Sequence, residues 1–321
     1  MKCPECNGVW QAPPNFASIK VCPFCGAELK SLAMMAKSNS GFVDEKDKNT
    51  EFNSEPTPDY DIPIYIEDPQ ITPIRKRLDE FYNDGLAIEL IRCHKGNFIM
   101  GSPERELGRW LDEKQHRVTF SEDFFICRFP VTQLQYQAVM GVNPSFFVSR
   151  NCPVDRVNWH EANLFCEKLN EIIDGVGVDG YKFQLPTEAQ WEYACRAGFN
   201  TSLNSGMNIM AEKGICFNLD FVAWYSSNSG GGTHRVGEKK PNPWGIYDMH
   251  GNIWEWCQDW YLADYGSDSI DPKGPESGDF KICRGGACSF EPRFCRCASR
   301  LRLKPEGKFD TIGFRLAYSK S

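Results

Sequence analysis

Apolar side chains recur at helical spacing in separate stretches of the chain, and this periodicity predicts amphipathic helices. The first stretch covers residues 73–83, and its apolar face consists of Ile74, Leu78 and Phe81 or Tyr82. Another follows Trp159, and its core stripe consists of Ala162, Phe165, Cys166, Leu169 and Ile172 or Ile173. The place of Cys166 in this stripe indicates a small buried side chain rather than a nucleophile.

Two capping boxes mark further helix starts. Thr132 and Gln135 begin a helix that ends near Gly141, and Thr187 and Gln190 begin a helical segment that ends at Gly198. After that glycine the helical periodicity stops, and the 27 glycines and 20 prolines of the chain favour long loops between short strands. The pattern therefore predicts an α+β fold that is irregular and rich in loops.

A separate small module is predicted at residues 1–30. Two C-x2-C pairs, fifteen residues apart, have the spacing of a zinc ribbon, and their ligands would be Cys3, Cys6, Cys22 and Cys25. A segment this short cannot bury enough apolar surface to fold alone, so zinc would stabilise it. A dithiol redox pair or unrelated cysteines are the open alternatives. The polar residues 31–60 then predict a flexible linker.

Composition narrows the partners and the location of the protein. No run of 18 apolar residues exists, so we expect no membrane span, and the start MKCPEC lacks the apolar core of a secretory signal. With 15 cysteines, a reducing cytoplasmic location would keep most of them as thiols or metal ligands. The net charge of −7 argues against nucleic acid as a partner.

Charge is distributed unevenly. Residues 281–321 hold ten lysines and arginines against three acids. Two interpretations are open: an anionic ligand docks on this segment, or its arginines tie down irregular backbone.

Residues 241–261, PNPWGIYDMHGNIWEWCQDWY, place four tryptophans among turn-forming residues, which suits a long ordered loop. This stretch resembles the signature of the formylglycine-generating enzyme (sulfatase-modifying factor) family, whose domain is a variant of the C-type lectin fold. Further matches follow in the family's order at residues 96–102, 129–136, 153–159, 185–194, 284–286 and 312–315. We therefore expect such a domain over residues 61–321.

The resemblance implies a calcium site in the tryptophan-rich loop. Carried over by position, its ligands are the side chains of Asp248 and Glu255 and the carbonyls of Gly251 and Ile253. Hard oxygen ligands of this kind suit calcium. The alternative is that the two carboxylates only bind loop amides.

The oxidase that gives the family its name holds copper(I) with two cysteines after the RGG turn. In this chain the segment after Arg284 holds Cys288, Cys295 and Cys297, but their spacing does not reproduce that pair. Cys295 and Cys297 would share a face if they lay in a strand. We expect a domain without the ordinary oxidase site; the alternative is a copper-dependent oxidase that converts a sulfatase cysteine to formylglycine with Cys295 and either Cys288 or Cys297.

The short closing segment also resembles the family's ligand-binding branch diversified by retroelements. That resemblance implies displayed side chains at Ser289, Phe290, Arg293, Phe294, Leu301, Leu303, Asp310 and Thr311. The resulting function hypothesis is a binding or accessory protein whose C-terminal loop face contacts a protein or peptide.

Overall fold

The computed structural model describes residues 67–82, 86–265 and 267–320 of the 321-residue chain. The proposed zinc ribbon with Cys3, Cys6, Cys22 and Cys25 lies outside the described residues, as does the proposed linker at 31–60. Both stay predictions.

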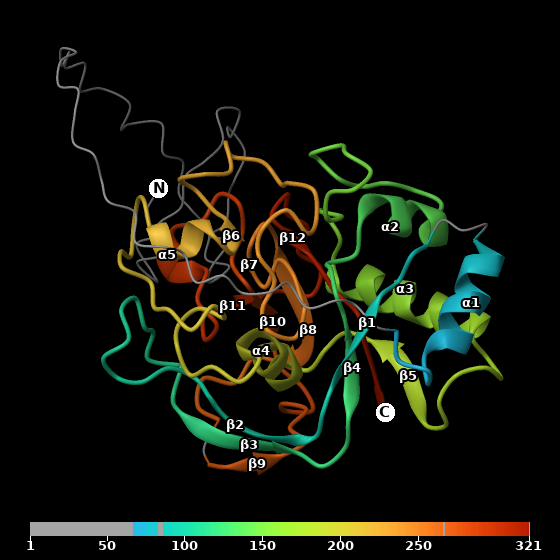
Figure 1. The fold of residues 1–321 in the computed structure, drawn as a ribbon, viewed down its shortest axis with the longest axis horizontal. Coiled ribbons are helices and arrows are strands. Elements are labelled where there is room, and N and C mark those ends of the chain that lie inside the picture. The colour runs from blue at the N-terminus through green and yellow to red at the C-terminus, as the bar shows by residue number, and fades with distance from the viewer. Residues whose placement is uncertain (1–66, 83–85, 266, 321) are drawn as a thin grey trace.

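The beginning and the end of the described chain meet in one antiparallel sheet of order β1-β4-β13-β5 (Figure 1). The C-terminal strand β13 therefore lies between strands from the first half of the domain. The bounds of the four strands are β1 Leu90–Cys93, β4 Phe124–Cys127, β5 Tyr181–Gln184 and β13 Ala317–Lys320. This pairing holds the C-terminal end of the domain against strands of its N-terminal half.

Three helices gather beside this sheet (Figure 1). They are α1 Thr72–Phe81, α2 Gln133–Met140 and α3 Trp159–Ile172. The capping box predicted at Thr132 is present, and Gly141 ends α2 in a left-handed conformation. Cys166 is buried in the α3 stripe as predicted. Of the two alternatives at the end of α1, Tyr82 packs on the core, whereas Phe81 is 61% exposed.

A second four-stranded sheet, of order β11-β10-β8-β12, lies at the centre of the domain (Figure 1). Its strands are β8 Trp254–Trp260, β10 Lys281–Arg284, β11 Arg300–Leu303 and β12 Ile312–Gly313. The prediction of one long loop over residues 241–261 is wrong for its second half, because Trp254, Trp256 and Trp260 lie in β8, which is buried on both faces over most of its length. The predicted helix with its cap at Thr187 is α4 Glu188–Arg196, which packs against β8 and β10.

The remaining elements are short, as the loss of periodicity after Gly198 predicts. Strands β2 Gly96–Met100, β3 His116–Phe120 and β9 Ser269–Ile270 form one sheet. Strands β6 Ala223–Trp224 and β7 His250–Gly251 pair in parallel, and α5 Phe217–Asp220 is a single turn. The α+β, loop-rich prediction is confirmed.

Within the described residues, no helix combines the length and the apolar character needed to cross a membrane.

Candidate functional site

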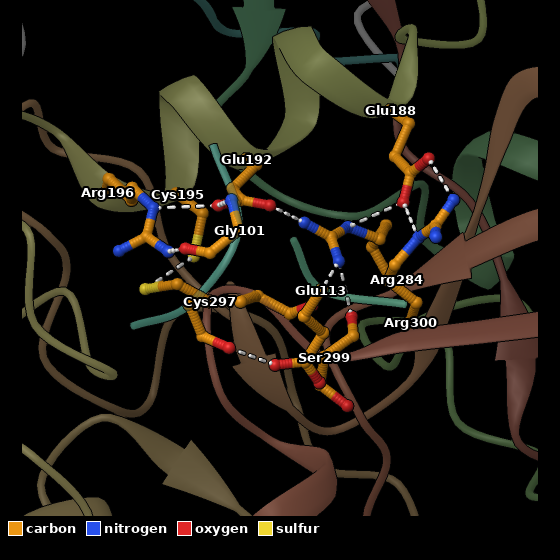
Figure 2. A network of polar contacts seen from close by, with 12 residues as sticks. Gly101, Glu113, Glu188, Glu192, Cys195, Arg196, Arg284, Cys297, Ser299 and Arg300 are labelled. Carbon is orange, nitrogen blue, oxygen red and sulfur yellow. Dashed lines mark hydrogen bonds and ion pairs between the residues drawn. The ribbon is translucent and has the colours of Figure 1, made fainter. Parts of the chain in front are cut away.

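The basic closing segment is anchored by arginines that face inward. Arg284, Arg296 and Arg315 are fully buried and reach glutamates from other parts of the chain. Figure 2 shows Arg284 extending between Glu192 and Glu188, both of which belong to α4. For these three arginines, the second interpretation of the positive charge holds: they tie down irregular backbone and are not free to bind an anionic ligand.

The RGG turn lies tightly against the segment that follows it. Gly285 and Gly286 have φ angles of 102° and 80°, a region that favours glycine. A Cβ atom on Gly286 would lie 2.5 Å from the Sγ atom of Cys295. The thiol of Cys295 therefore packs directly under the turn.

The three cysteines that sequence reasoning selected do not assemble into a copper pair. The side chain of Cys295 is buried in an apolar cluster with Leu203 and Tyr225, whereas Cys297 belongs to a different cluster. Cys295 and Cys297 do not lie in a strand, so the condition for a shared strand face is not met: residues 295–298 form bends and a turn after the short 3-10 helix Pro292–Phe294. Burial raises the pKa of the Cys288 thiol to about 12 and raises that of Cys295 as well. Both thiols are thus kept neutral.

A different cluster comes together from three distant parts of the chain: Cys195 in α4, His250 in β7 and Cys297. Their donor atoms all lie within 4.8 Å of one another, and all three side chains are fully buried. The Sγ atom of Cys195 donates to that of Cys297 at 3.6 Å and lies 4.0 Å from His250 Nε2 (Figure 2 shows the two thiols).

The imidazole of His250 is held by two backbone groups. Nδ1 lies 2.7 Å from the carbonyl oxygen of Cys295, and the amide of Asn204 donates to Nε2 at 3.0 Å. These partners assign the proton to Nδ1 and leave the lone pair on Nε2, the atom beside the thiols.

The two thiols differ in protonation. Burial raises the pKa of the Cys195 thiol well above its usual value, and its hydrogen bond to Cys297 adds to the rise. Burial also acts on Cys297, but the hydrogen bond from Cys195 and the nearby Arg196 guanidinium lower its pKa well below the usual value. The pair is a thiol that donates to a thiolate.

Sequence reasoning missed Cys195 and His250. The three members are 55 and 47 residues apart, so no local spacing links them. The closest available signal was that His250 lies inside the motif that carries the family resemblance.

The four residues predicted to hold calcium are buried, but other contacts engage the two carboxylates. Arg315 donates to both oxygens of Glu255, at 2.6 and 2.7 Å, and the Trp191 indole donates to one of them at 2.6 Å. Asp248 accepts from the amide of Gly237 at 2.8 Å, and the carbonyl of Gly251 accepts from the amide of Ile253 at 2.7 Å. Because Arg315 occupies both oxygens of Glu255, the residues as arranged in this structure do not fit calcium. The calcium site stays a prediction.

The eight positions predicted to be displayed divide into two groups. Five are partly exposed: Ser289, Phe290, Arg293, Asp310 and Thr311. The prediction is wrong for Phe294, Leu301 and Leu303, which are 6%, 6% and 5% exposed and belong to the main apolar core. The two leucines alternate inward along β11, which sequence alone assigned to a loop.

An open groove of about 340 Å³ borders the displayed face. Arg293 lies over the ring of Trp110 at 4.5 Å, and Trp110 also contacts Phe294 at a centroid distance of 6.3 Å. Three glutamates and three arginines line this groove together with Leu107, Gly108 and Trp110; the charged residues are Glu104, Arg105, Glu106, Arg109, Glu212 and Arg293.

The buried guanidinium of Arg296 links residues that line the groove to the domain core. Arg296 donates to Glu106 at 2.6 Å, to the carbonyl of Gly108 at 2.7 Å and to the carbonyl of Arg293 at 2.9 Å, and it also donates to both carboxylate oxygens of Glu113. The residue that follows it in the chain is Cys297, so the thiol cluster and the groove share one segment.

Comparisons with known proteins agree with the family resemblance of the sequence. The sequence model of the sulfatase-modifying factor enzyme 1-like domain (FGE-sulfatase) matches residues 83–320. The formylglycine-generating enzyme of Mus musculus is 28% identical over 256 residues, which are 77% of this chain and 59% of that protein. The chain thus spans about three fifths of the length of this relative.

Two solved structures share the fold. Treponema denticola variable protein 1 superposes with a TM-score of 0.63 and 31% identity, and PvdO from Pseudomonas aeruginosa with 0.62 and 27%. Each alignment covers 72% of this chain and 94% of the other. These neighbours confirm the predicted C-type lectin-like fold.

Proposed function

Because this chain belongs to the sulfatase-modifying factor enzyme 1-like domain family, we propose that it is a binding or accessory protein that recognises a protein or peptide segment in the groove beside Trp110 and Arg293. The observation that carries the proposal is the contrast between an open groove on this face and the burial of every cysteine in the described residues.

The lining of the groove suits a polypeptide. The stacked pair of Trp110 and Arg293 offers a flat surface for an apolar or aromatic side chain, and tryptophan and arginine are the residues enriched in strong contacts at protein interfaces. The acids and arginines along the wall can pair with charges of either sign on a bound segment. Phe290, packed at 5.5 Å against Phe294, extends the apolar part of this face.

The burial of the thiols argues against an oxidase. An oxidase that acts on a cysteine of another protein must present its copper or thiolate ligands to that substrate. Cys288 and Cys295 are fully buried, and burial raises the pKa of each thiol, so neither is available as a surface ligand.

The similarity to Treponema denticola variable protein 1 supports recognition through the segment between the RGG turn and β12. In the proposed function, Ser289, Phe290, Arg293, Asp310 and Thr311 are the positions of this segment that meet a ligand. Diversification of these positions is part of the proposal, as is a reducing, cytoplasmic setting for the thiols of the described residues.

A displayed library of random peptides tests the proposal. Peptides selected on the full chain should bind at least about tenfold more weakly to Trp110→Ala and Arg293→Ala, because contacts of this kind contribute more than about 1.4 kcal/mol each. The matched control is Ile270→Ala, which removes a 71% exposed side chain of β9 that does not line the groove. Equal affinity for all three variants would refute the groove as the binding site.

The oxidase alternative has its own readout. The full chain, loaded with copper(I), is incubated in air with a cysteine-containing sulfatase peptide and the products are analysed by mass spectrometry. Conversion of the cysteine to formylglycine that disappears in Cys295→Ser would replace the binding proposal. An unchanged peptide agrees with it.

A further inference from the structure

We propose that the groove beside Trp110 recognises a carboxylate group of the bound segment, and that Arg293 is the residue that binds this group. The inference rests on the proposed function and names its class of ligand: a peptide that offers either an acidic side chain or a free C-terminal carboxylate.

The side chain of Arg293 is held in place by its neighbours. A Cβ atom on Gly108 would lie 2.7 Å from the Cβ atom of Arg293, so this part of the groove wall packs directly on the arginine stem. The amide of Arg293 donates to the carbonyl of Glu212 at 3.3 Å. Its guanidinium lies 4.5 Å from the ring centroid of Trp110 and 4.9 Å from that of Phe294. Because the guanidinium is already positioned, little conformational entropy is lost when it binds a ligand.

The same guanidinium has few acceptors within the protein. Its Nε atom is buried and has no hydrogen-bond partner among the described residues. The carboxylate of Glu212 lies 3.8 Å from Nη1, which is longer than a hydrogen bond. The side chain of Arg293 is 20% exposed and lines the groove, so a ligand can reach it. A ligand carboxylate would supply the acceptor oxygens that the protein does not provide.

Arg296, three positions later, shows how a fully paired arginine is bound in this segment. It is buried and donates to Glu106 at 2.6 Å and to the two oxygens of Glu113 at 2.6 and 2.8 Å. Its contacts also engage Glu106, one of the three glutamates that line the groove. The contrast between the two arginines favours a ligand-binding role for Arg293 over a structural one.

The other charges of the groove select the class of ligand. Glu104 and Glu212 would repel a doubly charged phosphate more strongly than a singly charged carboxylate. A basic side chain that paired with Glu212 would also approach Arg293, since the two groups are 3.8 Å apart. A carboxylate can accept two hydrogen bonds from the guanidinium, while an apolar part of the same peptide packs on Trp110.

The experiment uses peptides that the full chain selects from two displayed libraries of random sequences. One library has free C-termini and the other is anchored through its C-termini, so enrichment in the second library indicates an acidic side chain. Each selected peptide is then synthesised with and without its carboxylate, by exchange of Glu for Gln or Asp for Asn or by amidation of the C-terminus. Removal of the carboxylate should weaken binding to the wild-type chain by about tenfold.

Arg293→Gln should abolish this preference. The paired peptides should bind the variant within about twofold of each other, because the partner of the carboxylate is gone. The matched control is Arg105→Gln, which removes the same charge from an exposed arginine of the groove lining and should keep the preference. An equal loss of preference in both variants would show that only the overall charge of the groove matters, and it would overturn the role of Arg293.

Glu212→Gln should have the opposite effect. Removal of the acid that lies 3.8 Å from Arg293 should strengthen binding of the carboxylate peptide by about two- to fivefold. Because the Glu212 side chain is 41% exposed, this variant keeps the test decisive even if Arg293→Gln does not fold. Weaker binding to Glu212→Gln would indicate a basic ligand and would contradict the inference.

Failure of this inference differs from failure of the proposed function. Peptides that bind less tightly to Trp110→Ala, but bind the wild-type chain equally well with and without a carboxylate, would overturn the inference and leave the groove as the binding site. Peptides that bind equally well to the wild type, Trp110→Ala and Arg293→Ala would refute the groove itself.

Discussion

Glu192 shows how single buried residues hold the domain together. Its carboxylate accepts from the amide of Gly101 at 2.9 Å, from Arg196 at 2.8 Å and from Arg284 (Figure 2). These partners belong to the end of β2, to α4 and to β10, so one side chain joins three elements. Glu188, one turn earlier on α4, also contacts Arg284, so both carboxylates of this helix face have structural partners.

Glu192→Gln should lower the free energy of unfolding by about 3–5 kcal/mol. The substitution removes the charge that compensates two buried guanidinium groups, and an uncompensated buried charge is costly. Urea titration of the full chain measures the change. The matched control is Glu122→Gln, whose partner Lys320 is on the surface, and we expect a change within about 0.5 kcal/mol. Equal effects of the two substitutions would contradict the network.

At the scale of elements, the parallel pairing of β6 and β7 requires a glycine at position 251. Gly251 lies in β7 with φ of 68°, and a Cβ atom on it would lie 2.0 Å from the carbonyl oxygen of Trp224 in β6. Its amide also donates to the carbonyl of Gly285 at 2.7 Å. The glycine therefore allows the tryptophan-rich loop to approach the RGG turn.

Gly251→Ala and Gly214→Ala separate steric clash from backbone strain. Both glycines have a positive φ, 68° and 70°, but a Cβ on Gly214 would meet nothing within 4 Å. We expect Gly214→Ala to destabilise the fold by about 1 kcal/mol through the left-handed conformation alone. Gly251→Ala should lower the free energy of unfolding by about 1–3 kcal/mol more, because backbone must move. Thermal or urea unfolding gives both values, and similar losses would mean that the β6–β7 contact is not restrictive.

At the scale of the whole molecule, buried carboxylates make stability depend on pH. Burial raises the pKa of Asp155 and Asp248 to about 6 and that of Asp259 to about 7. Asp259 is on β8, accepts from the amide of Glu188 at 2.7 Å and faces the charges of Glu188 and Lys281. In the unfolded chain an aspartate has a pKa of about 3.9.

Asp259→Asn should reveal this dependence. The folded state holds a proton at Asp259 that the unfolded state has lost, so the contribution of Asp259 to stability is fully present below about pH 4 and is lost as pH rises through about 7. The variant has no carboxyl group at this position and therefore lacks this pH-dependent contribution. Relative to wild type, it should gain about 2–3 kcal/mol of unfolding free energy between pH 5 and pH 8. Urea titrations at both pH values measure the gain, and a constant difference would show that Asp259 titrates normally.

Much of the architecture followed from local sequence. The boxes at Thr132 and Thr187 fixed where two helices begin, since side-chain oxygens there satisfy amides that the helix leaves unpaired. The stripe around Cys166 fixed the buried face of α3. The α+β class followed from the end of helical periodicity near Gly198. These features depend on residues within a few positions of each other, which is the range over which sequence alone is informative.

The groups that carry the chemistry were decided by tertiary structure. Cys195, His250 and Cys297 meet only because α4, β7 and the closing segment pack together, and no spacing along the chain encodes that meeting. The same packing turns Arg284 and Arg315 toward glutamates and buries Leu301 and Leu303 on β11. Sequence by itself determined the helices, their caps and the family of the fold. Which thiols share a site and which arginines remain on the surface depends on contacts between distant segments.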